Sequence, residues 1–256
     1  MKNTPMTGLY YFKRGLQGLR LKPLRPFIII PVAINILIYG VAMVWAYGKL
    51  NEWNQQLLDY LPDWLDFITW LLWPMFILML LVIMAYSFTI VANLIASPFN
   101  GLLSEKTENI MLDKAVPSPT RLVDWLLLVP RALGREVVKW MYFLPIIIGL
   151  LILTFVPVIN LVTPALWFIF GAWSMAVQYC DFCADNHQQS FAVMKRGLKK
   201  YRWAYLGFGA TVAAVSVIPL ANLLVMPAAV IGGSLMWSEN NLDEVNPSSP
   251  QAVIQR

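Results

Sequence analysis

The chain has 256 residues, of which 59% are hydrophobic and 13% are charged, whereas an average soluble domain is about 25% charged. Four long stretches contain no Asp, Glu, Lys or Arg, which excludes a water-soluble fold because surface helices need a polar face. The composition predicts an integral membrane protein. The net charge of +5 is typical of loops beside membrane spans, so we do not expect nucleic acid as a partner.

The first 25 residues are basic and precede an apolar run. Residues 1–25 hold six basic and no acidic residues, and the run Phe27–Gly48 is 22 residues long. About 20 residues cross the hydrocarbon layer as a helix, whereas a cleaved signal peptide has a core of about 7–15 residues. We therefore expect an uncleaved span at about 27–48. The N-terminus should be cytoplasmic, because basic residues collect on that side.

The second apolar stretch, Phe67–Ser104, is too long for a single crossing. It follows residues 49–66, which hold one basic and four acidic residues and which we place outside the cell. We expect a second span as a helix over about 64–97 and a break at Pro98. A polar helix that carries Glu105 should follow.

The last two apolar stretches are interrupted by prolines at their centres. The interruptions read Val156-Pro157-Val158-Ile159-Asn160-Leu161 and Ile218-Pro219-Leu220-Ala221-Asn222-Leu223, and each is followed by a second proline, Pro164 or Pro227. A proline removes a helical hydrogen bond and disfavours helix at the preceding residue. We predict two helical hairpins, at about 140–180 and 203–238. Their arms of about 15 residues are too short for the ~30 Å core, so the hairpins penetrate it only partly.

These elements predict the fold class, an all-α membrane protein. Residues 1–256 form one membrane domain with two long transmembrane helices, two proline-broken hairpins and interfacial helices. The cytoplasmic segments are 1–25, 105–139, 181–202 and 239–256. Irregular backbone at membrane depth requires burial by protein or a watery cavity, so the paired breaks favour a transport site. The alternative is that the prolines only kink ordinary spans.

Several short motifs resemble one known family. They are Pro98-Phe99-Asn100-Gly101-Leu102-Leu103, Pro130-Arg131 with Arg135-Glu136, Gln178-Tyr179-Cys180-Asp181 and Asp185-Asn186-His187. In this order they closely resemble the signature stretches of the bacterial CysZ family of inner-membrane sulfate transporters, from about Tyr11 to Trp237. The resemblance implies sulfate uptake for cysteine biosynthesis, two long transmembrane helices, two partly penetrating hairpins and a homo-oligomer in lipid.

Basic residues before the first span are candidate sulfate ligands. The segment that contains Arg20 and Arg25 looks like the sulfate-binding element of the resembled family, although Pro23 and Pro26 replace a glycine and a second arginine. A helix N-terminus offers free N–H groups and partial positive charge, and a guanidinium offers a planar fork of donors. The alternatives are a signal for topology or a contact with lipid phosphate.

Arg131 and Arg135 are a second pair of candidate sulfate ligands. They lie four residues apart, so they share one face of a helix that we expect to start near Pro130. Two close guanidiniums could hold sulfate at a pore mouth. The alternative is an interfacial helix in which they pair with Glu136.

The hairpin turns offer uncharged donors for a pore lining, namely Asn160, Thr163 and Asn222. New helices are expected to begin near Pro164 and Pro227, and their two N-termini together supply about one positive charge. That charge would attract sulfate without holding it too tightly to leave. Alternatively, the three side chains only cap their own helices.

Cys180, Cys183 and His187 resemble a metal or redox cluster. A structural zinc site takes four ligands, and the chain has two cysteines and one histidine. We therefore expect two cytosolic thiols, no metal, no cofactor, and His187 as a cap in the Asp-Asn-His turn. The lone histidine and the absence of a serine with a nearby base predict that the protein is not an enzyme.

The apolar stretches contain no carboxylate, so a proton relay at mid-membrane is excluded. Transport is then channel-like, or proton-linked through Glu105, Glu136 or His187 at the inner rim. Two rival functions remain. One is a membrane scaffold or accessory subunit whose hairpins pack against a partner, and the other is a pore for thiosulfate or sulfite.

Overall fold

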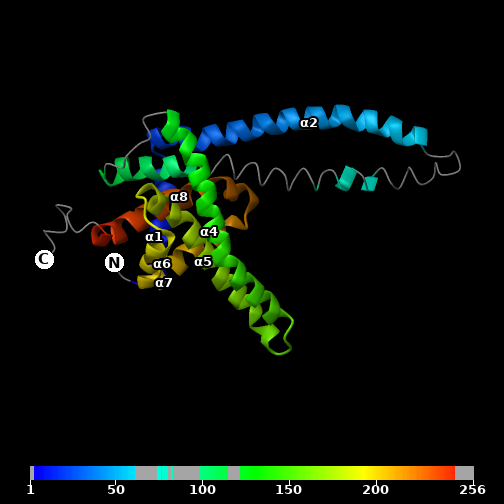
Figure 1. The fold of residues 1–256 in the computed structure, drawn as a ribbon. Helices are drawn as coiled ribbons and strands as arrows, with labels where there is room; N and C mark the ends of the chain where they lie inside the picture. Colours follow the sequence, from blue (N-terminus) through cyan, green and yellow to red (C-terminus); the bar gives the residue numbers. More distant parts are fainter. Residues whose placement is uncertain are drawn as a thin grey trace. The chain divides into compact units, whose positions relative to one another are not determined.

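A computed structural model describes residues 3–60, 99–114 and 122–245, with short pieces between 74 and 82. The regular elements of these residues are helices (Figure 1). Two of the described helices contain stretches long and apolar enough to cross a membrane, Lys22–Ala46 and Leu133–Thr154. Only 6% and 11% of their apolar windows are buried, so neither is the core helix of a soluble protein. The predicted all-α membrane protein is confirmed.

The chain divides into two compact units, one of Met1–Ile28 with Pro98–Arg256 and the other of Ile29–Ser97. The smaller unit contains most of α2, Pro26–Tyr60, which runs as one helix through the expected span at 27–48. Its side chains are largely exposed, as a helix surrounded by lipid requires. The expected span at 64–97 lies outside the described residues, apart from helical pieces at 74–75, 77–79 and 82.

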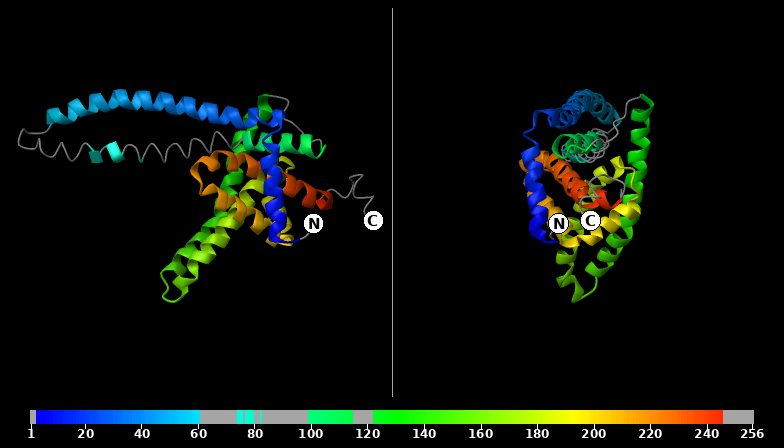
Figure 2. Two further views of the ribbon diagram at one scale, coloured as in Figure 1. Left: turned by 180° about the vertical axis from the view of Figure 1, so that it is seen from behind. Right: turned by 90° about the vertical axis from the view of Figure 1, so that its left-hand side faces the viewer.

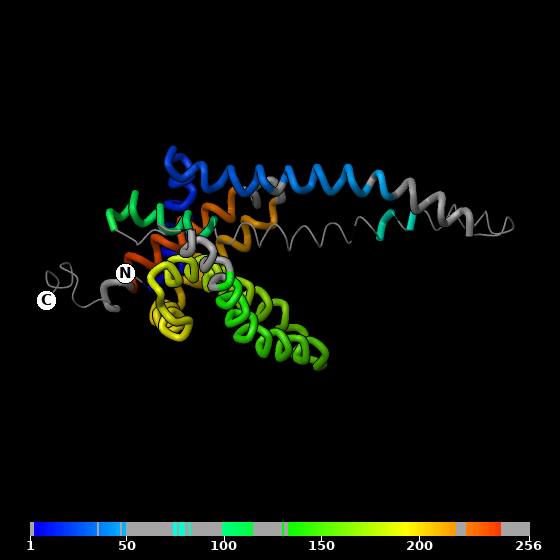
Figure 3. The backbone as a smooth tube through the Cα atoms, turned by 45° about the horizontal axis from the view of Figure 1, so that its top comes forward, coloured from blue at the N-terminus to red at the C-terminus, as the bar shows by residue number. Residues whose placement is uncertain are grey.

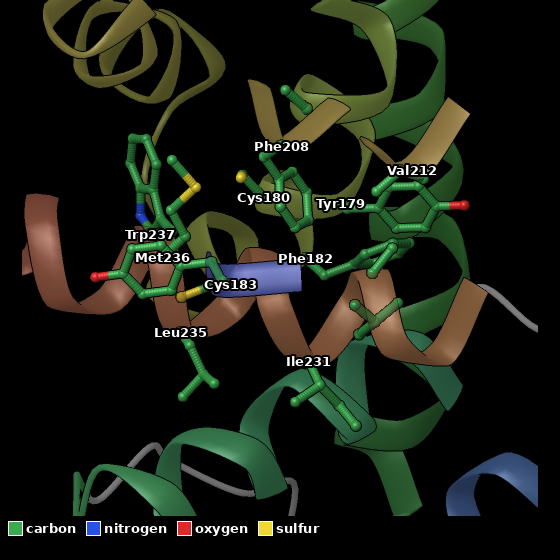
Figure 4. Close-up of a cluster of buried hydrophobic side chains, with 14 of the residues drawn as sticks. Tyr179, Cys180, Phe182, Cys183, Phe208, Val212, Ile231, Leu235, Met236 and Trp237 are labelled. Carbon is green, nitrogen blue, oxygen red and sulfur yellow. The ribbon is translucent and has the colours of Figure 1, made fainter. Parts of the chain in front are cut away.

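In the larger unit, the helix α8, Pro219–Val245, forms the centre. Residues 227–238 are buried on every face of the helix, and α1, α5 and α7 pack against it. Figure 4 shows side chains from α5, α7 and α8 meeting in one cluster that includes Phe182, Phe208 and Trp237. The last long apolar stretch of the sequence is therefore the core of this unit.

The N-terminal helix α1, Pro5–Gly18, is amphipathic and lies along α7 and α8 (Figure 2). Its buried residues recur with helical spacing and include three glycines: Gly8, Tyr11, Phe12, Gly15 and Gly18. A Cβ on Gly8 would overlap the backbone of α7, and one on Gly15 the backbone of α8. Small residues allow such close approach between helices. Asn3 strengthens the packing, because its Oδ1 accepts the N–H groups of Trp203 and Ala204 at the start of α7.

The first hairpin consists of α4, Leu122–Thr154, and α5, Thr163–Asn186, with the 3₁₀ turn η3, Ile159–Leu161, between them. The two arms run side by side (Figure 3). The break lies at Pro157 and a helix begins beside Pro164, as predicted. The expected helix start near Pro130 is wrong, since Pro130 lies inside α4. The arms have 33 and 24 residues rather than about 15, because both continue into the polar segments.

The second hairpin consists of α7, Arg202–Ser216, and α8. The turn between the two helices is short, because Pro219 is already the first residue of α8. Proline suits this first position because its missing N–H would have no helical acceptor there. The expected helix start near Pro227 is wrong: Pro227 lies inside α8.

The turns of both hairpins are apolar and exposed. Phe155, Val158 and Leu161 in the first turn are 84%, 78% and 82% exposed, and Val217 in the second is 79% exposed. The N–H groups of Phe155, Asn160, Leu161 and Val162 nevertheless find acceptors within their own turn. An apolar tip with its backbone donors satisfied internally is suited to lipid.

Two further helices complete the larger unit. Residues 99–111 form the polar helix expected after Pro98, but its Glu105 and Glu108 are buried rather than exposed. The helix α6, Phe191–Lys200, buries Met194 and Leu198 and is capped by Ser190, whose Oγ accepts the N–H of Val193. The helix α6 lies within the expected cytoplasmic segment 181–202, whereas the helix 99–111 begins before the expected segment 105–139.

Candidate functional site

The most polar site in the described part of the larger unit is an ionic network between α4 and α5. It consists of Arg135, Glu136 and Lys139 from α4 and Gln178 and Asp181 from α5. Arg135 Nε donates to Asp181 Oδ1 at 2.9 Å, and Arg135 Nη2 lies 2.7 Å from the same oxygen. Lys139 Nζ donates to Glu136 Oε1 at 2.5 Å and to Gln178 Oε1 at 2.9 Å. Lys139 Nζ also lies 3.4 Å from Asp181 Oδ2.

The charges of this network are balanced internally. Two cations face two carboxylates, and a third carboxylate, Asp185, lies 3.9 Å from Arg135 Nε. Arg135 also donates through Nη1 to the backbone oxygen of Gln189 at 2.6 Å. The network therefore carries no excess positive charge for a dianion. Arg135, expected as a sulfate ligand, bonds to Asp181 and to the backbone of Gln189.

The structure does not test the expected pair of Arg131 and Arg135. The side chain of Arg131 lies outside the described residues. The cation that accompanies Arg135 in the network is Lys139, four residues after it, at the same helical spacing.

The other candidate sulfate ligands, Arg20 and Arg25, lie in the turn that joins α1 to α2. Both side chains are exposed, as is that of Lys22. Arg25 Nη2 donates to the backbone oxygen of Arg20 at 3.1 Å, so the two residues are neighbours in space. Within the described residues this basic turn has no ion pair with a carboxylate, in contrast to Arg135.

The backbone of the basic turn differs from the expected anion site at a helix N-terminus. The turn contains η1, Lys22–Leu24, anchored by the buried Leu24. The N–H groups of Leu24, Arg25 and Ile28 all find backbone acceptors, and Pro26 has no N–H. The 3₁₀ turn thus uses several of the donors that a free helix end would offer. The guanidinium groups of Arg20 and Arg25 and the ammonium group of Lys22 are further donors of this turn.

The candidate pore-lining residues occupy different settings. Asn160 is exposed at the tip of the first hairpin. Thr163 is buried there, and its Oγ1 donates to the backbone oxygen of Asn160 at 2.7 Å. That bond ties the hydroxyl to the turn but caps no N–H group of α5, which has no side-chain cap. The side chain of Asn222 lies outside the described residues.

The candidate proton-linked residues lie apart from one another. Glu136 belongs to the ionic network, and Glu105 is buried in the helix 99–111. His187 caps α5 through its N–H, as expected, while its Nε2 lies 2.8 Å from Glu108 Oε2. Glu108 also accepts the thiol of Cys183 at 3.2 Å. No local pattern in the sequence predicts this link, because 75 residues separate Glu108 from Cys183.

A third polar contact joins the two ends of the larger unit. Tyr11 Oη donates to Glu239 Oε2 at 2.7 Å, and Arg14 Nη1 donates to Glu239 Oε1 at 2.6 Å. Burial, followed by the hydrogen bond to Glu239, raises the pKa of Tyr11 to about 12. This contact fixes α1 against the end of α8. The basic turn follows α1 directly in the sequence.

Known proteins resemble this chain over nearly all of its length. Residues 11–227 match the family model described as "Sulfate transporter CysZ/Etoposide-induced protein 2.4". A protein of Pseudomonas paraeruginosa named "Sulfate transporter CysZ" is 43% identical over 91% of this chain and 94% of its own length. Proteins of the same name from Pseudomonas aeruginosa and Pectobacterium atrosepticum are 42% and 39% identical; the matches cover 91% and 90% of this chain and 94% and 84% of theirs.

Proposed function

Because the chain belongs to the family of CysZ sulfate transporters and etoposide-induced protein 2.4, we propose that it carries sulfate into the bacterial cell. The protein lies in the inner membrane with its N-terminus in the cytoplasm, and the imported sulfate supplies cysteine biosynthesis. The observation that carries the proposal is the 43% identity to a sulfate transporter over 91% of the chain. The family model, which matches residues 11–227, extends over the basic turn, the first hairpin and part of the second.

We assign the gathering of sulfate to Arg20 and Arg25. Both are exposed cations in a turn without a described carboxylate partner, so their charge is available to a dianion. Arg135 is supported less well, because Asp181 and Gln189 already accept from its guanidinium. The remaining candidates are supported by the sequence alone: Arg131, Asn160, Thr163 and Asn222.

We propose that passage is channel-like and downhill. The apolar stretches contain no carboxylate, and the titratable groups at the rim already have partners. Glu136 accepts from Lys139, and His187 lies against Glu108. We therefore assign these groups to fixed contacts and not to a proton relay.

We also propose that the protein works as a homo-oligomer in contact with lipid. The apolar tips of both hairpins are exposed in the single chain. Lipid suits their side chains, but polar backbone that ends inside a bilayer needs protein around it. Neighbouring copies of the chain would provide that cover and line a passage between hairpins.

The proposal is tested by uptake of radiolabelled sulfate into liposomes that contain only the purified protein. We expect uptake above that of empty liposomes, and a fall of about 10-fold or more in R20Q and R25Q, because a charged hydrogen bond contributes about 1.5–3 kcal/mol. K13Q is the matched control, since Lys13 is an exposed cation on α1 outside the turn.

Each rival gives a different result in this assay. Uptake no higher than in empty liposomes would contradict transport and favour the scaffold. Stronger competition by thiosulfate or sulfite than by unlabelled sulfate would favour a pore for those anions. Equal loss in K13Q and R25Q would show a general surface-charge effect and contradict the assignment to the turn.

A further inference from the structure

We propose that Glu108, Cys183 and His187 form a binding site for a divalent transition-metal ion of the zinc class. The three residues come from two segments that the fold brings together, the helix 99–111 and the end of α5. Their ligand atoms all lie within 4.8 Å of one another. This site is separate from the ionic network and from the basic turn, so the inference goes beyond sulfate transport.

The distances between the ligand atoms are close to those of a metal site. Cys183 Sγ lies 3.2 Å from Glu108 Oε1, and His187 Nε2 lies 2.8 Å from Glu108 Oε2. Bonds of about 2.0–2.3 Å from zinc to oxygen, nitrogen and sulfur place tetrahedral ligand atoms about 3.3–3.7 Å apart. Small rotations of the Glu108 carboxylate and the His187 ring would therefore open the group around an ion.

The local backbone keeps the two ligands of α5 together. Cys183 and His187 are four residues apart and lie on one face of the helix, and the N–H of His187 bonds to the oxygen of Cys183 at 3.2 Å. Asn186, the residue before His187, joins α5 to the helix 99–111, since its Nδ2 donates to the oxygen of Gly101 at 2.8 Å. The site is thus built on rigid elements rather than on a loop.

The charge of the three groups suits a divalent ion. A thiolate and a carboxylate together carry two negative charges and neutral imidazole carries none, so an ion of charge +2 gives a neutral buried centre. Glu108 is 0% exposed, and an isolated buried carboxylate is costly. Thiolate, imidazole and carboxylate are the ligand types that zinc and cobalt accept together.

Binding must displace the thiol proton. Without an ion, the thiol of Cys183 donates its hydrogen to Glu108 Oε1 at 3.2 Å. Cys183 is therefore protonated without the ion. On binding, the sulfur–hydrogen bond is replaced by a sulfur–metal bond, and one proton leaves to solvent. The His187 side chain is 22% exposed, which gives the ion and the proton a route.

Figure 4 shows Cys180 and Cys183 in the same apolar cluster, which supplies a matched control. Both thiols are fully buried, but only Cys183 contacts Glu108 among the described contacts. The full-length protein, purified in detergent and treated with a chelator, is titrated with Co²⁺. We expect one ion per chain, a thiolate-to-cobalt absorption band and the intense visible bands of a four-coordinate ion.

The variants make the test specific. C180S should bind as the wild type does. C183S should lose the thiolate band, and H187Q should weaken binding by more than about 100-fold, because even outer-shell changes cost about 10–100-fold. H187Q alters a partly exposed side chain, so it keeps the fold even if C183S does not.

Two results would overturn the site. One is the absence of a thiolate band in the wild type, which would leave the three residues as a hydrogen-bonded cluster only. The other is a band that survives in C183S or disappears in C180S. Because the readout is metal absorption, it is independent of sulfate uptake, and either proposal can fail while the other stands.

Discussion

Tyr11 is a buried hydroxyl whose protonation state contributes to stability. Its pKa rises from 10.0 to about 12, so the neutral form is favoured in the folded chain. The resulting stabilisation is complete below pH 10 and is lost as pH rises from 10 towards 12. We therefore expect Y11F to be less sensitive to pH than the wild type in this window.

The measurement is the thermal unfolding midpoint in detergent between pH 9 and 12. The control is Y10F, which removes a hydroxyl from a side chain that is 56% exposed and should follow the wild type. If the unfolding midpoint fell equally with pH in Y11F and in the wild type between pH 10 and 12, the assignment of this stabilisation to Tyr11 would be contradicted.

Asp181 is a nearly fully buried carboxylate that Arg135 neutralises. We expect R135Q to lower the free energy of unfolding towards the lower end of about 3–5 kcal/mol, the cost of leaving a buried charge without its partner. Lys139 remains 3.4 Å from Asp181 and limits the loss. The exposed Arg196 supplies the control, R196Q.

A double-mutant cycle with D181N separates the ion pair from general damage. The double variant R135Q/D181N should be more stable than the sum of the two single losses predicts. Additive losses would show that the two groups do not depend on each other.

The sequence predicted which residues of the ionic network between α4 and α5 carry charge, but it did not predict how they pair. Arg135 and Lys139 share a helical face by spacing alone. Asp181 lies 46 residues away from Arg135, and nothing local predicts such a contact. The same limit explains why Cys183 and His187 drew attention as a cluster while Glu108, in a different helix, did not.

Helix packing in the larger unit depends on glycines at points of close approach. A Cβ on Gly209 in α7 would overlap the backbone oxygen of Ala172 in α5. We expect G209A to lower the free energy of unfolding by about 1–3 kcal/mol through overpacking, and thermal unfolding in detergent measures it.

Gly171, the residue before Ala172, is the control. A Cβ there meets nothing within 4 Å, so G171A should be neutral or stabilising by about 1 kcal/mol through helix propensity. An equal loss of stability in both variants would contradict close packing at Gly209 as the cause of the loss.

The hairpins show how far proline patterns predict helix breaks. Pro157 and Pro164 marked the first turn correctly. Pro219 and Pro227 stand in nearly the same frame, yet Pro219 starts α8 and Pro227 lies within it. A proline is compatible with a first helical turn or, where neighbouring helices bury the freed groups, with a helix interior. Since residues 227–238 of α8 are buried on every side, the helices around Pro227 decide the outcome, and the sequence of the hairpin alone does not specify them.

Channel-like passage of a dianion should respond to voltage. Moving one elementary charge across 100 mV changes the free energy by about 2.3 kcal/mol, so sulfate gains about twice that. We expect an inside-positive potential, set with potassium and valinomycin, to accelerate sulfate uptake into liposomes. A pH gradient at zero potential should leave uptake unchanged. Accumulation driven by the pH gradient alone would contradict the channel and favour proton coupling.

The position of α1 has a consequence for biosynthesis. This helix is among the first parts of the chain to leave the ribosome, but its partners α7 and α8 are among the last. Until about 240 residues have been made, the apolar side of α1, with Tyr11 and Phe12, has no docking surface. The nascent helix would then rest on the surface of the bilayer, and final closure of the unit would follow the synthesis of α8 instead of accompanying that of α1.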